Sequence, residues 1–99
     1  MRPIHLARLD KERPVLILTR ELVRPHLTRV TVAPITRTVL GLSTEVPVGA
    51  ANGLDHESVV SCDNILTVPT STLGPRIGSL LPTQELELAE SIRAAFDLV

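Results

Sequence analysis

Short apolar runs that follow or precede a proline indicate a fold rich in β-strands. Residues 15–18 (VLIL) are all apolar and come directly after Pro14, a run too short for a helix and typical of a buried strand. Residues 30–32 (VTV) are β-branched, which suits a half-buried strand, and Pro34 interrupts the pattern soon afterwards. Because proline lacks a backbone donor and is confined to strand ends, edges or bulges, we expect the second run to end near Pro34.

Other segments show further strand patterns, and the C-terminal segment shows a helical one. Strands are expected at residues 4–9, 42–48, 58–68 and 76–81, and the VTV run belongs to a strand at 27–35. The strand at 58–68 should bend or divide at Asp63 and Asn64, and Pro47 should lie on a sheet edge or a bulge. Thr83 is the expected N-cap of a helix whose apolar residues recur at helical spacing: Leu88, Ile92, Ala95, Phe96 and Val99. The predicted fold class is mainly β with a C-terminal α-helix, arranged as a small barrel.

The composition predicts one small globular domain in a reducing compartment. The chain has 99 residues, of which 43% are hydrophobic, enough for a single domain with a modest core. Cys62 is the single cysteine, so no intrachain disulfide can form, and a free thiol within a strand pattern suits the core of a cytoplasmic protein. Charged residues occupy positions 8–13, where a signal peptide would be apolar, and no run predicts a membrane span.

Charge is distributed unevenly along the chain. Residues 1–40 carry eight basic and three acidic groups, a net charge of +5, whereas residues 41–99 carry two basic and eight acidic groups, a net charge of −6. Nine of the ten basic residues are arginine, whose planar fork of donors suits phosphate or carboxylate. The single aromatic residue, Phe96, argues against binding of nucleic acid by stacking of bases on aromatic side chains.

The two central strands should form an antiparallel hairpin. If the reversal is centred between Val23 and Pro25, residue i on the first strand faces residue 47–49 minus i on the second. Arg13 then lies beside Thr36, and a guanidinium beside a hydroxyl can bind an anion. The alternative from the residues alone is a structural bond from Arg13 to a carbonyl group or to Glu12.

The three histidines are expected to be structural or solvent-exposed rather than acid–base groups. His26 lies at the reversal, far from Arg13, and His5 should face about residue 18 in the middle of the sheet. His56 lies in or beside a flexible loop at residues 49–55. These histidines and Cys62 show no metal-ligand spacing, so no metal or cofactor is expected.

Four sequence segments and the closing helix follow the order found in the MazF/PemK family of toxin endoribonucleases, which the chain resembles over nearly its whole length. The segments are RPVLIL (13–18), VTVAPIT (30–36), STEVPVGAANGL (43–54) and SVVSCDNILTV (58–68). The resemblance implies that residues 1–99 form a single MazF-like toxin domain with the SH3-like barrel of the MazF/CcdB type. It also implies a homodimer with an RNA groove across it, in which a flexible acidic segment of a MazE-like antitoxin binds.

The resemblance further implies an activity and its residues. Members of this family cleave single-stranded RNA at short motifs without a metal ion, by attack of the ribose 2′-hydroxyl on the adjacent phosphate. The products are a 2′,3′-cyclic phosphate and a 5′-hydroxyl. The catalytic pair of the family corresponds to Arg13 and Thr36, and the positions expected to contact RNA are Lys11, Pro14, Arg37, Thr38, Asp63 and Asn64.

Three departures from the family pattern affect base recognition. The loop before Arg13 is reduced to residues 10–12, Asn64 replaces a glutamine, and Leu66 occupies a position that is basic in the family. Two alternative functions lack the residues they need. A CcdB-like gyrase poison of the same fold depends on a tryptophan-containing tail, which this chain lacks, and an SH3-like adaptor needs an aromatic groove.

Overall fold

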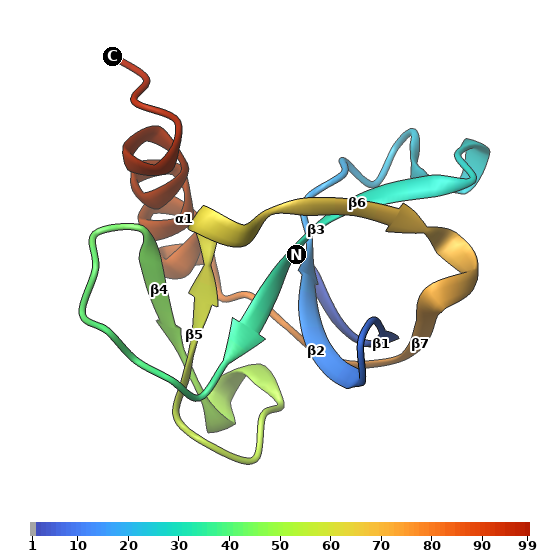
Figure 1. Cartoon of the computed structure of the whole chain (residues 1–99), viewed down its shortest axis with the longest axis horizontal. Helices are drawn as coiled ribbons and strands as arrows, with labels where there is room; N and C mark the ends of the chain where they lie inside the picture. Colours follow the sequence, from blue (N-terminus) through green and yellow to red (C-terminus); the bar gives the residue numbers. More distant parts are fainter. Residues whose placement is uncertain (1) are drawn as a thin grey trace.

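The apolar runs and the segments around them form seven strands and one α-helix in the computed structural model, which describes residues 2–99 (Figure 1). The strands are β1 (Pro3–Arg8), β2 (Glu12–Ile17), β3 (Arg29–Thr36), β4 (Glu45–Val48), β5 (Ser58–Ser61), β6 (Leu66–Pro69) and β7 (Leu73–Ser79). The helix α1 (Pro82–Ala95) follows them. Short 3-10 turns connect the strands: η1 (Arg24–His26), η2 (Ala50–Asn52), η3 (Cys62–Asn64) and η4 (Thr70–Thr72).

The sheet is antiparallel and is organised around β3. Its strand order is β4-β5-β3-β2-β1-β7, and β6 also pairs with β3. The start of β3 pairs with β6, its middle pairs with β2, and its last residues pair with β5. Figure 1 shows the consequence: β3 connects a part made of β4, β5 and α1 to a part made of β1, β2, β6 and β7. The predicted class, mainly β with a C-terminal helix, is confirmed.

The register of the β2–β3 hairpin agrees with the sequence expectation. Val15 faces Pro34 and Ile17 faces Val32, so facing residue numbers add to 49. The same relation places Arg13 near Thr36, just beyond the last pair of this ladder. The expectation for His5 is wrong, because His5 faces Val15 rather than residue 18. The β1–β2 connection is a tighter turn than that expectation allowed.

The central strands are buried on both faces. Leu16 and Ala33 belong to a core cluster that also contains residues of β4, β5 and α1. Their neighbours Val15 and Val32 belong to a second cluster with Val68 of β6. Strands covered on both faces lose the alternation of polar and apolar residues. This arrangement explains why residues 15–18 form a continuous apolar run.

The strand expected at 42–48 is shorter in the structure and begins at Glu45. The Glu45 carboxylate accepts hydrogen bonds from the backbone N–H groups of Leu40, Gly41 and Leu42 at 2.8–3.3 Å. These bonds hold residues 40–42 in a turn. Pro47 lies on β4, the edge strand of the sheet, as expected.

The last two elements begin earlier than expected. β7 starts at Leu73 rather than at residue 76. The N-cap of α1 is Leu81 rather than Thr83, because Pro82 occupies the first helical turn and the Gln84 side chain accepts the Leu81 N–H at 2.9 Å. The helix ends at Ala95, so two residues of the expected apolar stripe, Phe96 and Val99, are exposed beyond it. Within residues 2–99 no helix is both long and apolar enough to cross a membrane.

Candidate active site

A cavity of about 720 Å³ lies where β2 begins and β3 ends, and we call it the Arg13 cavity. Its floor is apolar and includes Ile35, Leu54 and Ile77. Six of the eight residues predicted for the site line it: Lys11, Arg13, Pro14, Thr36, Arg37 and Thr38. The hairpin register therefore brings together the residues that the sequence singled out, although their roles in RNA cleavage stay predictions.

Arg13 is held by a carboxylate that the sequence reasoning did not identify. Its Nε donates to Asp10 Oδ1 at 3.0 Å, and Nη2 donates to Asp10 Oδ2 at 3.2 Å. The alternative partners, Glu12 or a carbonyl, are not used. The Arg13 hydrogen bond lowers the pKa of Asp10 to about 2, with a further contribution from the Lys11 backbone N–H. The same pairing raises the pKa of Arg13. At neutral pH both groups are therefore charged.

The pair leaves one edge of the guanidinium available. Nε and Nη2 bind Asp10, while Nη1 has no hydrogen-bond partner among residues 2–99. The Arg13 side chain is one-third exposed and faces the Arg13 cavity. A ligand in the cavity can thus receive hydrogen bonds from Arg13 while Asp10 holds its orientation.

Thr36 is the last residue of β3 and is half-buried. It pairs with Val59 of β5, which fixes the end of β3 on that side. Its Oγ1 accepts the Thr38 backbone N–H at 3.1 Å, which leaves the hydroxyl proton free to be donated. Arg37 and Thr38 follow as exposed residues on the rim of the cavity.

The Arg13 cavity is lined by side chains of both charges, and three of them are cationic. Lys11, Arg13 and Arg37 line it, and of these three only Arg13 forms an ion pair with another residue of the described chain. Glu12 and Asp55 contribute carboxylates. Such a site suits an anion that also carries hydrogen-bond donors, for example a phosphate linked to a ribose. Among residues 2–99 no group of three or more His, Cys, Asp or Glu side chains is placed to hold a metal ion.

The segment after η2 contributes His56, which the sequence left only as a lesser candidate for acid–base chemistry, and Ser58, which the sequence did not single out. His56 and Ser58 line the Arg13 cavity, and Ser58 Oγ donates to the His56 carbonyl at 3.0 Å. His56 is exposed, as expected, but it faces the site. The buried side chain of Asn52 anchors this segment, because it donates to the Ser79 carbonyl at 3.0 Å and to Gln84 Oε1 at 2.6 Å. A local sequence pattern cannot predict hydrogen bonds between residues so far apart in the chain.

Two predicted RNA contacts lie elsewhere. Asp63 and Asn64 belong to η3 and do not line the Arg13 cavity. Asp63 Oδ2 accepts the Thr44 hydroxyl at 2.6 Å, and Asn64 Nδ2 donates to Ser61 Oγ at 2.8 Å. These bonds connect η3 to β5 and to the residue before β4, so the structure gives both side chains a structural role. Their contact with RNA stays a prediction.

Cys62 is a core residue, as expected, although it lies in η3 rather than within a strand. Burial raises the pKa of its thiol to about 11, and the neighbouring Asp63 carboxylate adds to the shift. A thiol that stays protonated at neutral pH is a poor nucleophile. Cys62 therefore takes no part in the chemistry of the site.

Residues 4–96 match the family of PemK-like, MazF-like toxins of type II toxin–antitoxin systems. The chain belongs to this toxin family. It is 70% identical to endoribonuclease MazF3 of Mycobacterium tuberculosis over 98 residues. The aligned residues cover 99% of this chain and 95% of that protein. The resemblance seen in the sequence is confirmed. The match to MazF3 also confirms the enzyme class, that of an endoribonuclease.

Solved structures show the same fold. The Mycobacterium tuberculosis toxin MazF-mt6 superposes with a TM-score of 0.97 at 69% identity and covers 99% of both chains. A mycobacterial endoribonuclease solved in complex with its cognate antitoxin has a TM-score of 0.88 at 23% identity and covers 98% of this chain and 93% of that one. The predicted MazF type of barrel is therefore confirmed.

Proposed function

We propose that this chain, acting as one domain of residues 1–99, is a cytoplasmic toxin that cleaves single-stranded RNA at short sequence motifs without a metal ion. In this reaction the ribose 2′-hydroxyl attacks the adjacent phosphorus, and the bond from phosphorus to the 5′-oxygen breaks. The 2′-proton leaves with a base, the 5′-oxygen takes up a proton, and the products carry a 2′,3′-cyclic phosphate and a 5′-hydroxyl. The observation that carries the proposal is the meeting of Arg13 and Thr36 in one cavity with Lys11 and Arg37.

Arg13 acts by charge and hydrogen bonding. A guanidinium keeps its proton at neutral pH, and the Asp10 carboxylate raises the pKa of Arg13 further, so Arg13 is no general base. Its free Nη1 edge points to a phosphate oxygen whose charge grows in the transition state. Asp10 fixes the guanidinium in advance, and such preorganised donors typically contribute about a hundredfold to a thousandfold in rate.

Thr36 orients the same phosphate. Its hydroxyl oxygen accepts the Thr38 N–H, which leaves the hydroxyl proton available for an acceptor in the cavity. Lys11 and Arg37 neutralise neighbouring phosphates of the RNA strand. Pro14 and Thr38 shape the wall on which the strand lies.

Two partners follow from the family and are proposed here. A MazE-like antitoxin with an acidic segment would cover the cationic N-terminal half, and the mycobacterial relative with the same fold was solved with its antitoxin. A homodimer is supported by exposed apolar side chains beside the cavity, since Val39, Leu40 and Leu42 are 57%, 68% and 48% exposed. Exposed apolar patches of this kind mark protein contacts.

Cleavage assays with purified protein test the proposal. Varied RNA is incubated with EDTA present, and wild type is compared with Arg13→Ala and Thr36→Ala. We expect products with 5′-hydroxyl ends from the wild type and almost none from either variant. Loss of cleavage in EDTA, or full activity of Arg13→Ala, would overturn the proposal. Intact RNA together with growth arrest would indicate the CcdB-like alternative.

A further inference from the structure

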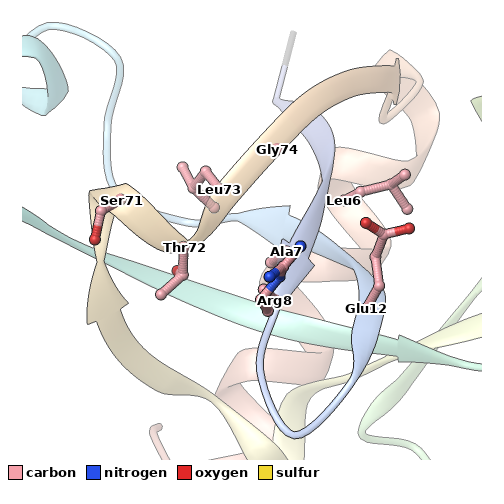
Figure 2. Close-up of a pocket in the computed structure, with 8 residues that line it drawn as sticks. All are labelled: Leu6, Ala7, Arg8, Glu12, Ser71, Thr72, Leu73 and Gly74. Atoms are coloured by element: carbon pink, nitrogen blue, oxygen red, sulfur yellow. The ribbon is translucent and has the colours of Figure 1, made fainter.

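A second cavity, of about 330 Å³, lies across the β1–β2 hairpin from the Arg13 cavity, and we call it the Arg8 cavity. It is formed by the end of β1, the start of β2 and the segment that runs from η4 into β7. Figure 2 shows Leu6 and Glu12 at one edge, Ser71 and Leu73 at the other, and Arg8 between them. None of the residues assigned to catalysis lies in this cavity.

The two cavities are neighbours. Leu6 and Glu12 line both of them, so a strand passing over these two side chains would reach from one cavity to the other. The ladder between β1 and β7 shifts register between His5 and Ala7, where two steps along β1 face three steps along β7, so the extra residue of this bulge lies on β7. Bulges redirect side chains and are common beside binding sites. Here the bulge lies in the β7 wall of the Arg8 cavity, which contains Leu73 and Gly74.

Arg8 differs from Arg2 and Arg13 because its guanidinium has no partner among residues 2–99. It is exposed, and among residues 2–99 it forms neither an ion pair nor a side-chain hydrogen bond, although Glu12 faces it across the ladder. The nearby Thr72 hydroxyl donates to the Pro69 carbonyl at 2.7 Å, whereas the exposed Ser71 hydroxyl has no partner in the same part of the chain. The cavity therefore offers a guanidinium fork and a hydroxyl to an anion.

We propose that the Arg8 cavity is a subsite for RNA flanking the cleavage step, in which Arg8 binds a backbone phosphate and Ser71 donates to the same nucleotide. The inference rests on the proposed function, since it takes the occupant of the Arg13 cavity to be RNA. The Glu12 carboxylate between the cavities repels phosphate, so the strand crosses it with a sugar hydroxyl or a base amino group. Phosphates then lie on either side, at Arg13 and at Arg8.

Binding of uncleavable RNA tests the subsite. The probe is 2′-fluoro RNA of mixed sequence, which lacks the attacking hydroxyl, as a dodecanucleotide and as a tetranucleotide. We expect Arg8→Gln to weaken binding of the long RNA about fivefold and to reduce its salt slope by about 0.7, the value for one lost phosphate contact. The Kd for the tetranucleotide should not change. Arg29→Gln is the matched control and should change neither, because Arg29 is an exposed arginine at the start of β3 with no ion-pair partner in the described part of the chain.

A second variant keeps the subsite testable if Arg8→Gln does not fold. Ser71→Asp places a negative charge in the Arg8 cavity and should weaken the long RNA alone. If Arg8→Gln binds the long RNA as wild type does, or loses affinity equally for both lengths, the subsite is wrong. Binding of an acidic peptide is measured in the same way. If Arg8→Gln weakens binding of this peptide and leaves RNA binding unchanged, the cavity is a protein site and the inference is overturned.

The same measurements separate the subsite from the proposed chemistry. Ordinary RNA is incubated with the wild type in parallel with the binding assays. If that RNA stays intact while Arg8→Gln still weakens the long probe selectively, the proposed cleavage fails and the subsite stands. If RNA is cleaved and the variant binds normally, the subsite fails and the cleavage stands.

Discussion

Two arginines in this protein have the same exposure but opposite consequences. The side chains of Arg2 and Arg13 are each 33% exposed, and each pairs with one carboxylate. Arg2 binds Glu85 of α1 through Nε at 3.1 Å and the Leu18 carbonyl through Nη1 at 2.8 Å, so it joins β1, the end of β2 and the helix. Among residues 2–99 Arg13 binds only Asp10, three residues away, and its Nη1 has no partner there and lies beside a cavity. Both guanidinium groups thus bond through two of their three nitrogens. The partners of Arg2 lie on distant segments, so Arg2 supports the fold, whereas the single partner of Arg13 is local and leaves its third nitrogen to a ligand in the cavity.

The largest effect should come from replacing Arg13. Arg13→Ala should lower single-turnover cleavage about a hundredfold to a thousandfold, because a preorganised donor to the developing charge is lost. Thermal unfolding should change little, since the Asp10–Arg13 pair is exposed. Arg13→Lys, measured beside it, tests whether the fork or the charge alone is needed, and a lysine that restored the wild-type rate would favour charge alone.

Thr36→Val should have the next largest effect, about tenfold to a hundredfold on the cleavage rate. The substitution keeps the shape and removes the hydroxyl that orients the phosphate. Unfolding experiments should show a near-normal midpoint, which separates the chemical effect from a folding effect. An unchanged rate would remove Thr36 from the site.

Asp10→Asn should lower the rate about tenfold by loosening the Arg13 fork. Its pH dependence has a defined sign. Because the folded-state pKa of Asp10 lies near 2, below the ordinary 3.8, the pair contributes stability above the ordinary pKa and loses it as pH falls toward 2. Plots of the free energy of unfolding against pH should therefore run parallel for wild type and Asp10→Asn above about pH 5. Profiles that diverge at neutral pH would contradict this assignment.

Arg2→Ala should have the smallest effect on activity, less than about twofold. It should instead lower the free energy of unfolding by about 1 kcal/mol, because a partly exposed ion pair and one hydrogen bond to a carbonyl are lost. Denaturant titration measures this loss. An Arg2→Ala protein that folded normally but cleaved RNA poorly would contradict the distinction between Arg2 and Arg13.

The local parts of the fold were predictable from the sequence. The run at 15–18 has no polar alternation because β2 is covered on both faces, and this pattern was visible without coordinates. The hairpin register followed from the position of the turn, and it brought Arg13 and Thr36 to one cavity. These features depend on residues close together in the chain or on a single reversal.

Features that depend on turn geometry or distant contacts were not predictable. Asp10 and Glu12 both flank the β1–β2 turn, and only its conformation decides that Asp10 meets Arg13. His56 enters the site because Asn52 bonds to Ser79 and Gln84, residues about thirty positions away. Leu81 replaces Thr83 as the N-cap because Gln84 reaches back to it.

Chemical rescue of Arg13→Ala would show whether a guanidinium at this position drives cleavage. The Asp10 carboxylate remains in the variant and can hold a free guanidinium ion in place of the lost side chain. We expect low concentrations of guanidinium to restore part of the single-turnover cleavage rate in a saturable manner, with no gain for the wild type or for Arg2→Ala. An Arg13→Ala protein that cleaves RNA at the wild-type rate without added guanidinium would contradict the role assigned to Arg13.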